Sequence, residues 1–219
     1  KMSKSLGNVI DPKEVIDKFG AEPFRLWCAL EGNLEKDDMK CSFERIEGAV
    51  KTLTKLWNIA KFVDQFSLEM IRKKEKVGEE LETHELTPEL LDITLADLDK
   101  WIIREMGELV KFSSQHYEQY DFHNPAVMAR HFMWETFASH YLELAKNRAY
   151  NQHGKFDKWE QESAVFTLHY CLNTLLRLLA PVIPFVTSHI YKEIYSKDVH
   201  EEIFPKYMVM EGTGISKDD

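Results

Sequence analysis

Apolar residues recur at steps of three and four along most of the chain. The first long pattern begins after Ser42, a residue type that caps helix N-termini, and it continues to Val63. Its apolar members are Ile46, Val50, Leu53, Trp57, Ala60 and Val63. This spacing places them on one face of a helix, so it predicts a single long amphipathic helix.

Further patterns of the same period follow. They cover residues 94–112, 124–148 and 158–179. The second of these opens with Asn124-Pro125, a capping residue followed by a first-turn proline. Its stripe consists of Val127, His131, Trp134, Ala138, Tyr141, Ala145 and Arg148. We expect a long helix in each of these segments.

Pro181 and Pro184 break the last long pattern, and a final helix is expected near Ile190 and Tyr195. Long amphipathic patterns joined by short connectors can bury their apolar faces only against one another. The sequence therefore predicts an all-α fold, with an antiparallel helix bundle over residues 42–198.

The residues before the bundle form a smaller unit. Asp11-Pro12 combines a capping residue with a first-turn proline and predicts a helix that ends at Gly20. A second short helix is expected over residues 24–30. We therefore predict a module over residues 1–41 that precedes the bundle.

Two segments lack helical periodicity. Residues 72–89 are dense in charge, which is typical of a surface linker. Residues 199–219 are predicted to form an extended C-terminal tail that packs through Ile203, Phe204 and Pro205.

The composition is that of a soluble globular domain. Of the 219 residues, 44% are hydrophobic and 30% are charged. No apolar run approaches the roughly 20 residues that cross a bilayer, and no signal-peptide pattern is visible, so we expect a cytoplasmic protein without a membrane partner. Neither the three cysteines nor the nine histidines follow a metal-ligand spacing, so we predict no metal site.

The net charge of −9 excludes a protein that coats nucleic acid nonspecifically, because phosphate binding needs clustered Lys and Arg. DNA is therefore not an expected partner, and any RNA contact is local. The segment from Lys146 to Trp159 is such a local cluster, because basic side chains alternate there with aromatic and amide side chains.

The candidate RNA-binding residues of this cluster are Lys146, Asn147, Arg148, Asn151, Lys155, Lys158 and Trp159. Single-stranded RNA is recognised by side chains of these types, because aromatic and guanidinium planes stack on bases while amides read base edges. The alternative interpretation is a helix C-terminus whose basic residues complement the helix dipole. Arg45, Lys51 and Lys55 share a helix face and have the same two interpretations, RNA contact or surface ion pairs.

The chain opens with Lys1-Met2-Ser3-Lys4-Ser5. Two ammonium groups among small hydroxyl residues, followed by a glycine, suit a loop that neutralises a triphosphate. By charge alone, a solvated basic loop is the more common interpretation of such a short run.

Longer blocks of sequence carry a family resemblance. KMSKSLGNVIDP, at residues 1–12, resembles the second signature of class I aminoacyl-tRNA synthetases, and residues 20–26 resemble the helix that follows it. Residues 38–48, followed by Leu56-Trp57-Asn58, resemble the start of the anticodon-binding bundle of this family. Residues 141–146 and 175–185 are similar to two further blocks of that bundle.

The resemblance implies the C-terminal part of an aminoacyl-tRNA ligase, with a signature loop, a stem-contact module and an anticodon-binding bundle. It implies that Lys4 stabilises the phosphates of ATP, with Mg²⁺ in the complete enzyme, while aminoacyl-adenylate forms. Lys1 is expected to assist, and Ser3 and Ser5 to shape the loop. The loop alone is expected to bind ATP weakly and to catalyse nothing, since charge stabilisation needs a preorganised site.

Within the class, K-L-W-N at residues 55–58 and Y-x-E-x-x-K at residues 141–146 are most similar to valyl-tRNA synthetases, with isoleucyl-tRNA synthetases second. The implied partner is tRNA, specifically tRNA(Val). The His-x-Gly-His signature and the editing domain of such enzymes are expected upstream of this chain. The alternative from another class is a noncatalytic helical module that binds RNA or protein and keeps the signature as a relic.

Overall fold

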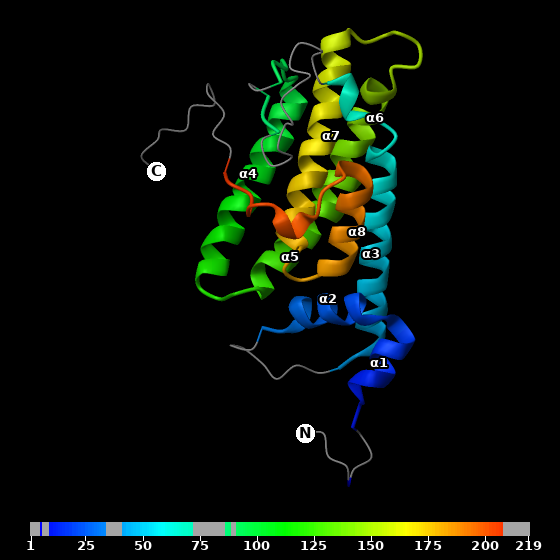
Figure 1. The fold of residues 1–219 in the computed structure, drawn as a ribbon, viewed down its shortest axis with the longest axis vertical. Coiled ribbons are helices and arrows are strands. Elements are labelled where there is room, and N and C mark those ends of the chain that lie inside the picture. Colours follow the sequence, from blue (N-terminus) through cyan, green and yellow to red (C-terminus); the bar gives the residue numbers. More distant parts are fainter. Residues whose placement is uncertain (1–4, 6–8, 34–40, 72–85, 89–90, 208–219) are drawn as a thin grey trace.

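The computed structural model describes residues 5, 9–33, 41–71, 86–88 and 91–207, and the regular structure in these residues is helical throughout (Figure 1). The α-helices are α1 (Pro12–Phe19), α2 (Ala21–Glu31), α3 (Phe43–Val63), α4 (Asp97–Glu118), α5 (His123–His131), α6 (Leu142–Tyr150), α7 (Lys158–Leu179) and α8 (Pro184–Tyr195). A π-helical segment, η5 (Phe132–Tyr141), joins α5 to α6, and two short 3₁₀ helices are η2 (Leu68–Met70) and η6 (Val199–Glu201). The predicted all-α fold is confirmed.

Local capping explains why several helix ends match the sequence signals. The Asp11 carboxylate accepts a hydrogen bond from the Lys13 N–H at 2.9 Å, and Pro12 opens α1. Gly20 ends α1 with a φ of +89°, in the left-handed region that glycine tolerates. Ser42 caps α3, because its Oγ accepts from the Arg45 N–H at 3.3 Å.

Two predicted helix starts differ from the structure. Asn124 lies inside α5 rather than before it, and Asp121 supplies the cap by accepting from the N–H groups of His123 and Asn124. The helix expected after Thr94 begins at Asp97. The N–H of Ala96, which precedes α4, donates instead to the Ser163 hydroxyl of α7 at 2.9 Å, so a tertiary contact replaces the local cap.

The π-helical segment changes which residues face the core. His131 belongs to the predicted stripe but is exposed, whereas Phe132, Met133 and Phe137 are buried. A π-helix has more residues per turn than an α-helix, so it rotates the apolar face relative to a continuous 3.6-residue period. The stripe resumes in α6, where Ala145 and Arg148 are buried.

Helix α7 occupies the centre of the bundle. Every residue from Ser163 to Leu179 is buried, because α3, α4, α5, α6 and α8 all contact this helix. In Figure 1, α7 stands among these helices with its N-terminal end at the same end of the molecule as the loop that joins α6 to α7.

The N-terminal helices pack against the bundle at the opposite end (Figure 1). Arg25 of α2 donates to the carbonyls of Val182 at 2.9 Å and Pro181 at 3.2 Å, just after α7. Glu22 accepts from the Val186 N–H in the first turn of α8 at 3.0 Å. The two charged groups therefore complement the dipoles of the helices that meet at the α7–α8 corner.

The C-terminal residues form a strap across the bundle. Pro205 is buried, the Phe204 ring contacts Tyr117 of α4, and Arg177 of α7 donates to the Ile203 carbonyl at 3.0 Å. The boundaries at residues 41 and 198 stay predictions. Most of the expected linker at residues 72–89 and the end of the expected tail at residues 208–219 lie outside the described residues.

Candidate nucleic-acid interface

Helices α6 and α7 meet at a tight turn, residues 151–157, which we call the α6–α7 turn. Asn151 ends α6 in the left-handed conformation, with a φ of +42°. Its side chain donates to the Phe156 carbonyl at 2.9 Å and accepts from the Phe156 N–H at 3.1 Å. Gln161 of α7 also donates to the Ala149 carbonyl at 2.8 Å. These contacts fix the backbone of the turn.

Polar and aromatic side chains are exposed on both sides of this turn. They are Asn147, Tyr150, Gln152, His153, Lys155, Lys158 and Trp159. The Trp159 side chain is 42% exposed, an unusual state for the largest apolar side chain. Exposed indole is available to stack on a base.

The basic residues of the cluster differ in their surroundings. Lys146 pairs with Glu143 at 2.5 Å, and Lys158 pairs with Glu162 at 3.0 Å. Both pairs are on the surface, where an ion pair contributes little and is readily exchanged for another anion. Lys155 is exposed and has no ion pair among the described residues, so its ammonium group is accessible on the turn.

The structure contradicts the predicted RNA contact of Arg148. This residue is 8% exposed, and its guanidinium donates two hydrogen bonds to the Asp99 carboxylate of α4, at 2.8 and 2.6 Å. Asn151 is partly exposed, and its amide nitrogen and oxygen each bond the backbone of Phe156, so its base-reading role stays a prediction. Both side chains hold the ends of the α6–α7 turn through hydrogen bonds within the chain.

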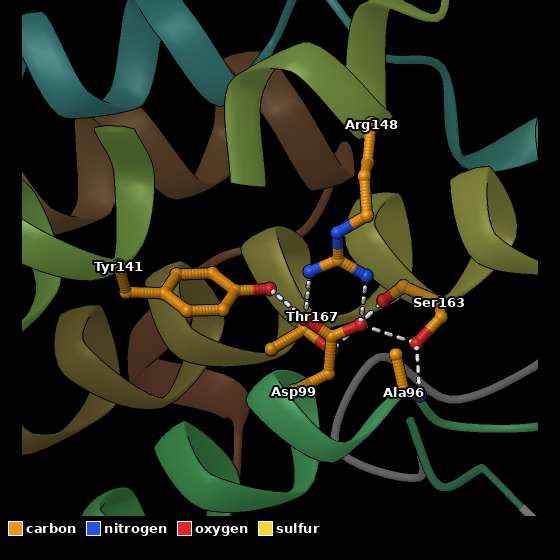
Figure 2. A network of polar contacts seen from close by, with 6 residues as sticks. All are labelled: Ala96, Asp99, Tyr141, Arg148, Ser163 and Thr167. Atoms are coloured by element: carbon orange, nitrogen blue, oxygen red, sulfur yellow. Dashed lines mark hydrogen bonds and ion pairs between the residues drawn. The ribbon is translucent and has the colours of Figure 1, made fainter. Parts of the chain in front are cut away.

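Asp99 is the centre of a buried polar network (Figure 2). Besides Arg148, the hydroxyls of Tyr141, at 2.8 Å, and Ser163 donate to its carboxylate, and Ser163 accepts from the Ala96 N–H. The hydrogen bonds to Asp99 raise the pKa of Arg148, and burial raises the pKa of Tyr141 well above its ordinary value. The network thus holds Arg148 as a cation and Tyr141 as a neutral donor.

Sequence reasoning missed Asp99, although one signal was present. Asp99 lies three and four residues before Ile102 and Ile103, so it falls on the buried face of α4 rather than on the solvent side. A carboxylate at such a position needs a buried partner. Arg148 lies on the predicted apolar stripe of residues 124–148 and is that partner.

A second basic surface lies on α3 and consists of Lys51, Lys55, Asn58 and Lys61, which we call the α3 face. Lys51, Asn58 and Lys61 are exposed, and Lys55 is partly buried. The Lys55 ammonium lies 5.8 Å from the Trp134 ring centroid, and the Lys61 ammonium lies 5.8 Å from the Trp57 centroid. The two tryptophans flank the α3 face and were expected in the core, but both are only partly buried.

The α3 face adjoins the α6–α7 turn. Tyr150, the last residue of α6, donates to the Gln65 side chain at 2.5 Å, and its ring meets Phe62 and Phe66 edge-on. Arg45, at the other end of α3, is paired with Glu31, as the ion-pair interpretation expected. The C-terminal end of α3 and the residues after it therefore lie beside Tyr150, the residue before the α6–α7 turn.

The structure describes one of the four candidate residues of the signature loop. Lys1, Ser3 and Lys4 lie outside the described residues, and Ser5 is exposed. Among the described residues, no cluster of histidine, cysteine or carboxylate side chains is arranged to hold a metal ion. No helix in the described ranges has the length and apolar character needed to span a membrane.

Two family profiles match the sequence. The profile described as "Anticodon-binding domain of tRNA ligase" matches residues 99–214, and "tRNA synthetases class I (I, L, M and V)" matches residues 1–41. Curated relatives include a valine–tRNA ligase of Aeropyrum pernix, 36% identical over 93% of this chain and 22% of the relative. Others are valine–tRNA ligases of Pyrobaculum aerophilum (36% identical; 92% of this chain, 23% of the relative) and Rickettsia felis (33%; 92% and 22%). The chain thus spans less than a quarter of the length of these relatives.

The fold is also similar to a solved structure. The agnB2 LeuRS of Agrobacterium radiobacter K84, determined as a ternary complex with tRNA and LeuAMS, superposes with a TM-score of 0.63 at 19% identity, over 94% of this chain and 22% of that chain. At this identity the likeness concerns the fold alone. The first family profile covers more than half of the sequence, from the first turn of α4 to the tail, so this chain belongs to the anticodon-binding domain family of class I tRNA ligases.

Proposed function

We propose that this chain binds tRNA and that the protein to which it belongs is a valine–tRNA ligase, which joins valine to tRNA(Val) with ATP. The observation that carries the tRNA-binding proposal is the accessible basic and aromatic surface at one end of the bundle, on a chain whose net charge is −9. The amino acid is inferred from the valine–tRNA ligases among the relatives.

Two parts of this surface have different chemistry. The exposed indole of Trp159 and the amides of Asn147 and Gln152, around the α6–α7 turn, suit unstacked anticodon bases. The ammonium groups of Lys51, Lys61 and Lys155 suit phosphates, because they are exposed point charges. We propose that the turn reads bases while these lysines hold the backbone of the RNA.

The signature loop belongs to the other half of the proposed reaction. In the proposed reaction the valine carboxylate would attack the α-phosphorus of ATP while the bond to the β-phosphate breaks and pyrophosphate leaves, and Mg²⁺ would neutralise part of the phosphate charge. We propose that Lys4 and Lys1 stabilise the phosphates during this step and that Ser3 and Ser5 shape the loop, on the basis of the sequence signature.

Binding of the purified chain to two tRNAs tests the proposal. One tRNA carries a valine anticodon, and the other differs only at the middle anticodon base. Lost hydrogen bonds to a base edge cost about 1–3 kcal/mol, so we expect filter binding at fixed ionic strength to favour the valine tRNA roughly tenfold or more. Equal affinity for both RNAs would contradict anticodon recognition by this chain.

Lys155→Ala separates phosphate contacts from base contacts. The substitution should weaken the binding of both tRNAs by a similar factor. It should also reduce the slope of the logarithm of the binding constant against the logarithm of salt concentration by about 1, since one phosphate contact is lost. Lys111→Ala is the matched control, because Lys111 is an exposed lysine of α4 outside the proposed surface. An unchanged salt slope in Lys155→Ala would remove this lysine from the RNA contacts.

A further inference from the structure

The buried carboxylate of Asp99 in α4 bonds side chains of η5, α6 and α7, and α6 and α7 are the helices on the two sides of the α6–α7 turn. Tyr141 ends η5, Arg148 lies in the last turn of α6, and Ser163 lies in the second turn of α7. All of them donate hydrogen bonds to one side chain of α4 that is 0% exposed (Figure 2). The helix that enters the turn and the helix that leaves it are thus attached to the same group.

The attachment has a fixed geometry. The two Arg148 nitrogens bond the two carboxylate oxygens of Asp99 side by side, at 2.8 and 2.6 Å. Such a bidentate pair allows one relative orientation of guanidinium and carboxylate, unlike a single ammonium contact. Ser163 fixes the position of α7 relative to α4 in a similar way, since its hydroxyl donates to Asp99 and accepts from the Ala96 N–H.

Stability alone is a weak reason for this arrangement. A buried ion pair gains little over well-packed apolar side chains, because both charges are desolvated. What it supplies is a single relative position of the groups that it joins. The exposed Asn147 lies one residue before Arg148, and the exposed Lys158 and Trp159 lie in the first turn of α7, ahead of Ser163.

We propose that Asp99, acting through Arg148 and Ser163, is a positioning residue that sets the α6–α7 turn so that the exposed groups on its two sides meet single-stranded RNA in one register. The inference rests on the proposed function, because it assigns the discrimination between RNA bases to a geometry fixed from inside the bundle. None of the three side chains touches RNA.

Arg177 provides a matched control for Arg148. Both arginines are 8% exposed, and both are held by buried hydrogen bonds. The Arg177 guanidinium, however, bonds the neutral Asn173 side chain and the Ile203 carbonyl, near the C-terminal end of α7 and roughly 20 Å along the helix axis from Ser163. It is therefore remote from the turn.

The experiment compares Arg148→Gln with Arg177→Gln at a temperature at which both chains are folded. Thermal unfolding monitors stability, and filter binding measures the ratio of affinities for the valine tRNA and the tRNA changed at the middle anticodon base. We expect both substitutions to lower the unfolding temperature. Arg148→Gln should reduce the affinity ratio from tenfold or more to about threefold or less, and Arg177→Gln should leave it unchanged. An unchanged ratio in Arg148→Gln, or an equal loss in both variants, would overturn the proposal.

Ser163→Ala gives a milder test if Arg148→Gln does not fold. It keeps the Arg148–Asp99 pair and frees only the α7 side, so the affinity ratio should fall while the unfolding temperature changes less. Tyr141→Phe also removes one hydrogen bond to Asp99 but leaves both sides of the turn attached, so it should keep the ratio. A ratio that falls in Tyr141→Phe and not in Ser163→Ala would contradict the assignment.

A second measurement separates failure of this inference from failure of the proposed function. If the unsubstituted chain does not distinguish the two tRNAs, the proposed anticodon recognition fails, and hydrogen exchange then decides the positioning role. The Phe156 amide bonds Asn151 inside the turn, so its exchange should accelerate at least tenfold in Arg148→Gln and not in Arg177→Gln. Equal exchange in the two variants would reject the role of Asp99.

Discussion

His169, in the middle of α7, is a histidine whose charge is decided by burial. It is 2% exposed, and its Nε2–H donates to the Phe66 carbonyl at 2.6 Å. The Tyr195 hydroxyl donates to the His169 carbonyl at 3.2 Å. Burial lowers the pKa of His169 from 6.5 to about 4, so the ring is neutral at pH 7. It links α7 to the end of α3, beside Tyr150.

The lowered pKa predicts how stability depends on pH. Above pH 6.5 the ring is neutral in both the folded and the unfolded chain. Between pH 6.5 and about 4 the unfolded chain binds a proton that the folded chain does not, so the free energy of unfolding should fall by up to about 3 kcal/mol as the pH drops. Urea unfolding at several pH values measures this loss. His169→Gln should flatten the dependence over the same range, and an equally steep curve in that variant would show that other groups cause it.

At the level of single residues, the sequence marked a cluster of exposed polar and aromatic residues but did not distinguish the buried members from the exposed ones. The alternation of basic, aromatic and amide residues marked the segment from Lys146 to Trp159, and most of its candidates are at the surface. Arg148 and Asn151 could not be separated from the others, because their partners are set by tertiary packing. Asp99 is 49 residues away from Arg148 in the chain, and no local signal identifies that pairing.

At the level of elements, helix ends follow local chemistry and helix interiors follow the tertiary environment. Asp11, Ser42 and Gly20 could be read from the sequence because each acts on its own helix. The π-helical segment from Phe132 to Tyr141 could not, because its residues have the same apolar period as an α-helix within the accuracy of the pattern. Because the π-helical segment was not predicted, His131 was placed on the apolar stripe, although it is exposed in the structure.

Two glycines within helices should differ in how much a substitution by alanine stabilises the chain. A Cβ on Gly48 of α3 would meet no atom within 4 Å, whereas a Cβ on Gly107 of α4 would lie 2.9 Å from the Tyr207 ring of the C-terminal strap. Gly48→Ala should therefore stabilise the chain by about 0.5–1 kcal/mol through helix propensity. Gly107→Ala should gain less, because Tyr207 must move, and the strap should become more sensitive to protease at residues 202–207. Thermal unfolding and limited proteolysis measure the two effects; a strap cleaved equally slowly in both variants would contradict the predicted contact.

At the level of the whole molecule, the sequence predicted a bundle but not which helix lies at its centre. The stripe on residues 158–179 indicated one apolar face, yet α7 is buried on all sides from Ser163 onward. A helix that is apolar all round is a core helix, and the run of small and apolar residues from Ser163 to Cys171 carries that signal. The position of the N-terminal helices on the bundle depends on long-range contacts such as Arg25 with Val182, which are 157 residues apart in the chain.

This long-range contact determines how firmly the N-terminal helices are held to the bundle. Arg25 of α2 donates to two carbonyls after α7, whereas Arg45 of α3 pairs with Glu31 of α2 on the surface, with 62% of the Arg45 side chain exposed. Both arginines bond across the boundary between the N-terminal helices and the bundle. The Arg25–Val182 bond is partly buried and the Arg25–Pro181 bond is exposed, so we expect about 0.5–1.5 kcal/mol from each, compared with about 0–1 kcal/mol from an exposed ion pair.

Arg25→Gln and Arg45→Gln should therefore differ, although each removes one arginine at the same boundary. Arg25→Gln should lower the free energy of unfolding by about 1–3 kcal/mol and accelerate hydrogen exchange in α2, because the carbonyls of Pro181 and Val182 lose their charged donor. Arg45→Gln should change both quantities little. Because α2 precedes the bundle and follows the signature loop in the chain, loss of this contact would loosen the connection between the two proposed ligand-binding regions. Equal exchange of α2 in the two variants would show that apolar packing of Leu26 and Trp27, rather than Arg25, holds the N-terminal helices in place.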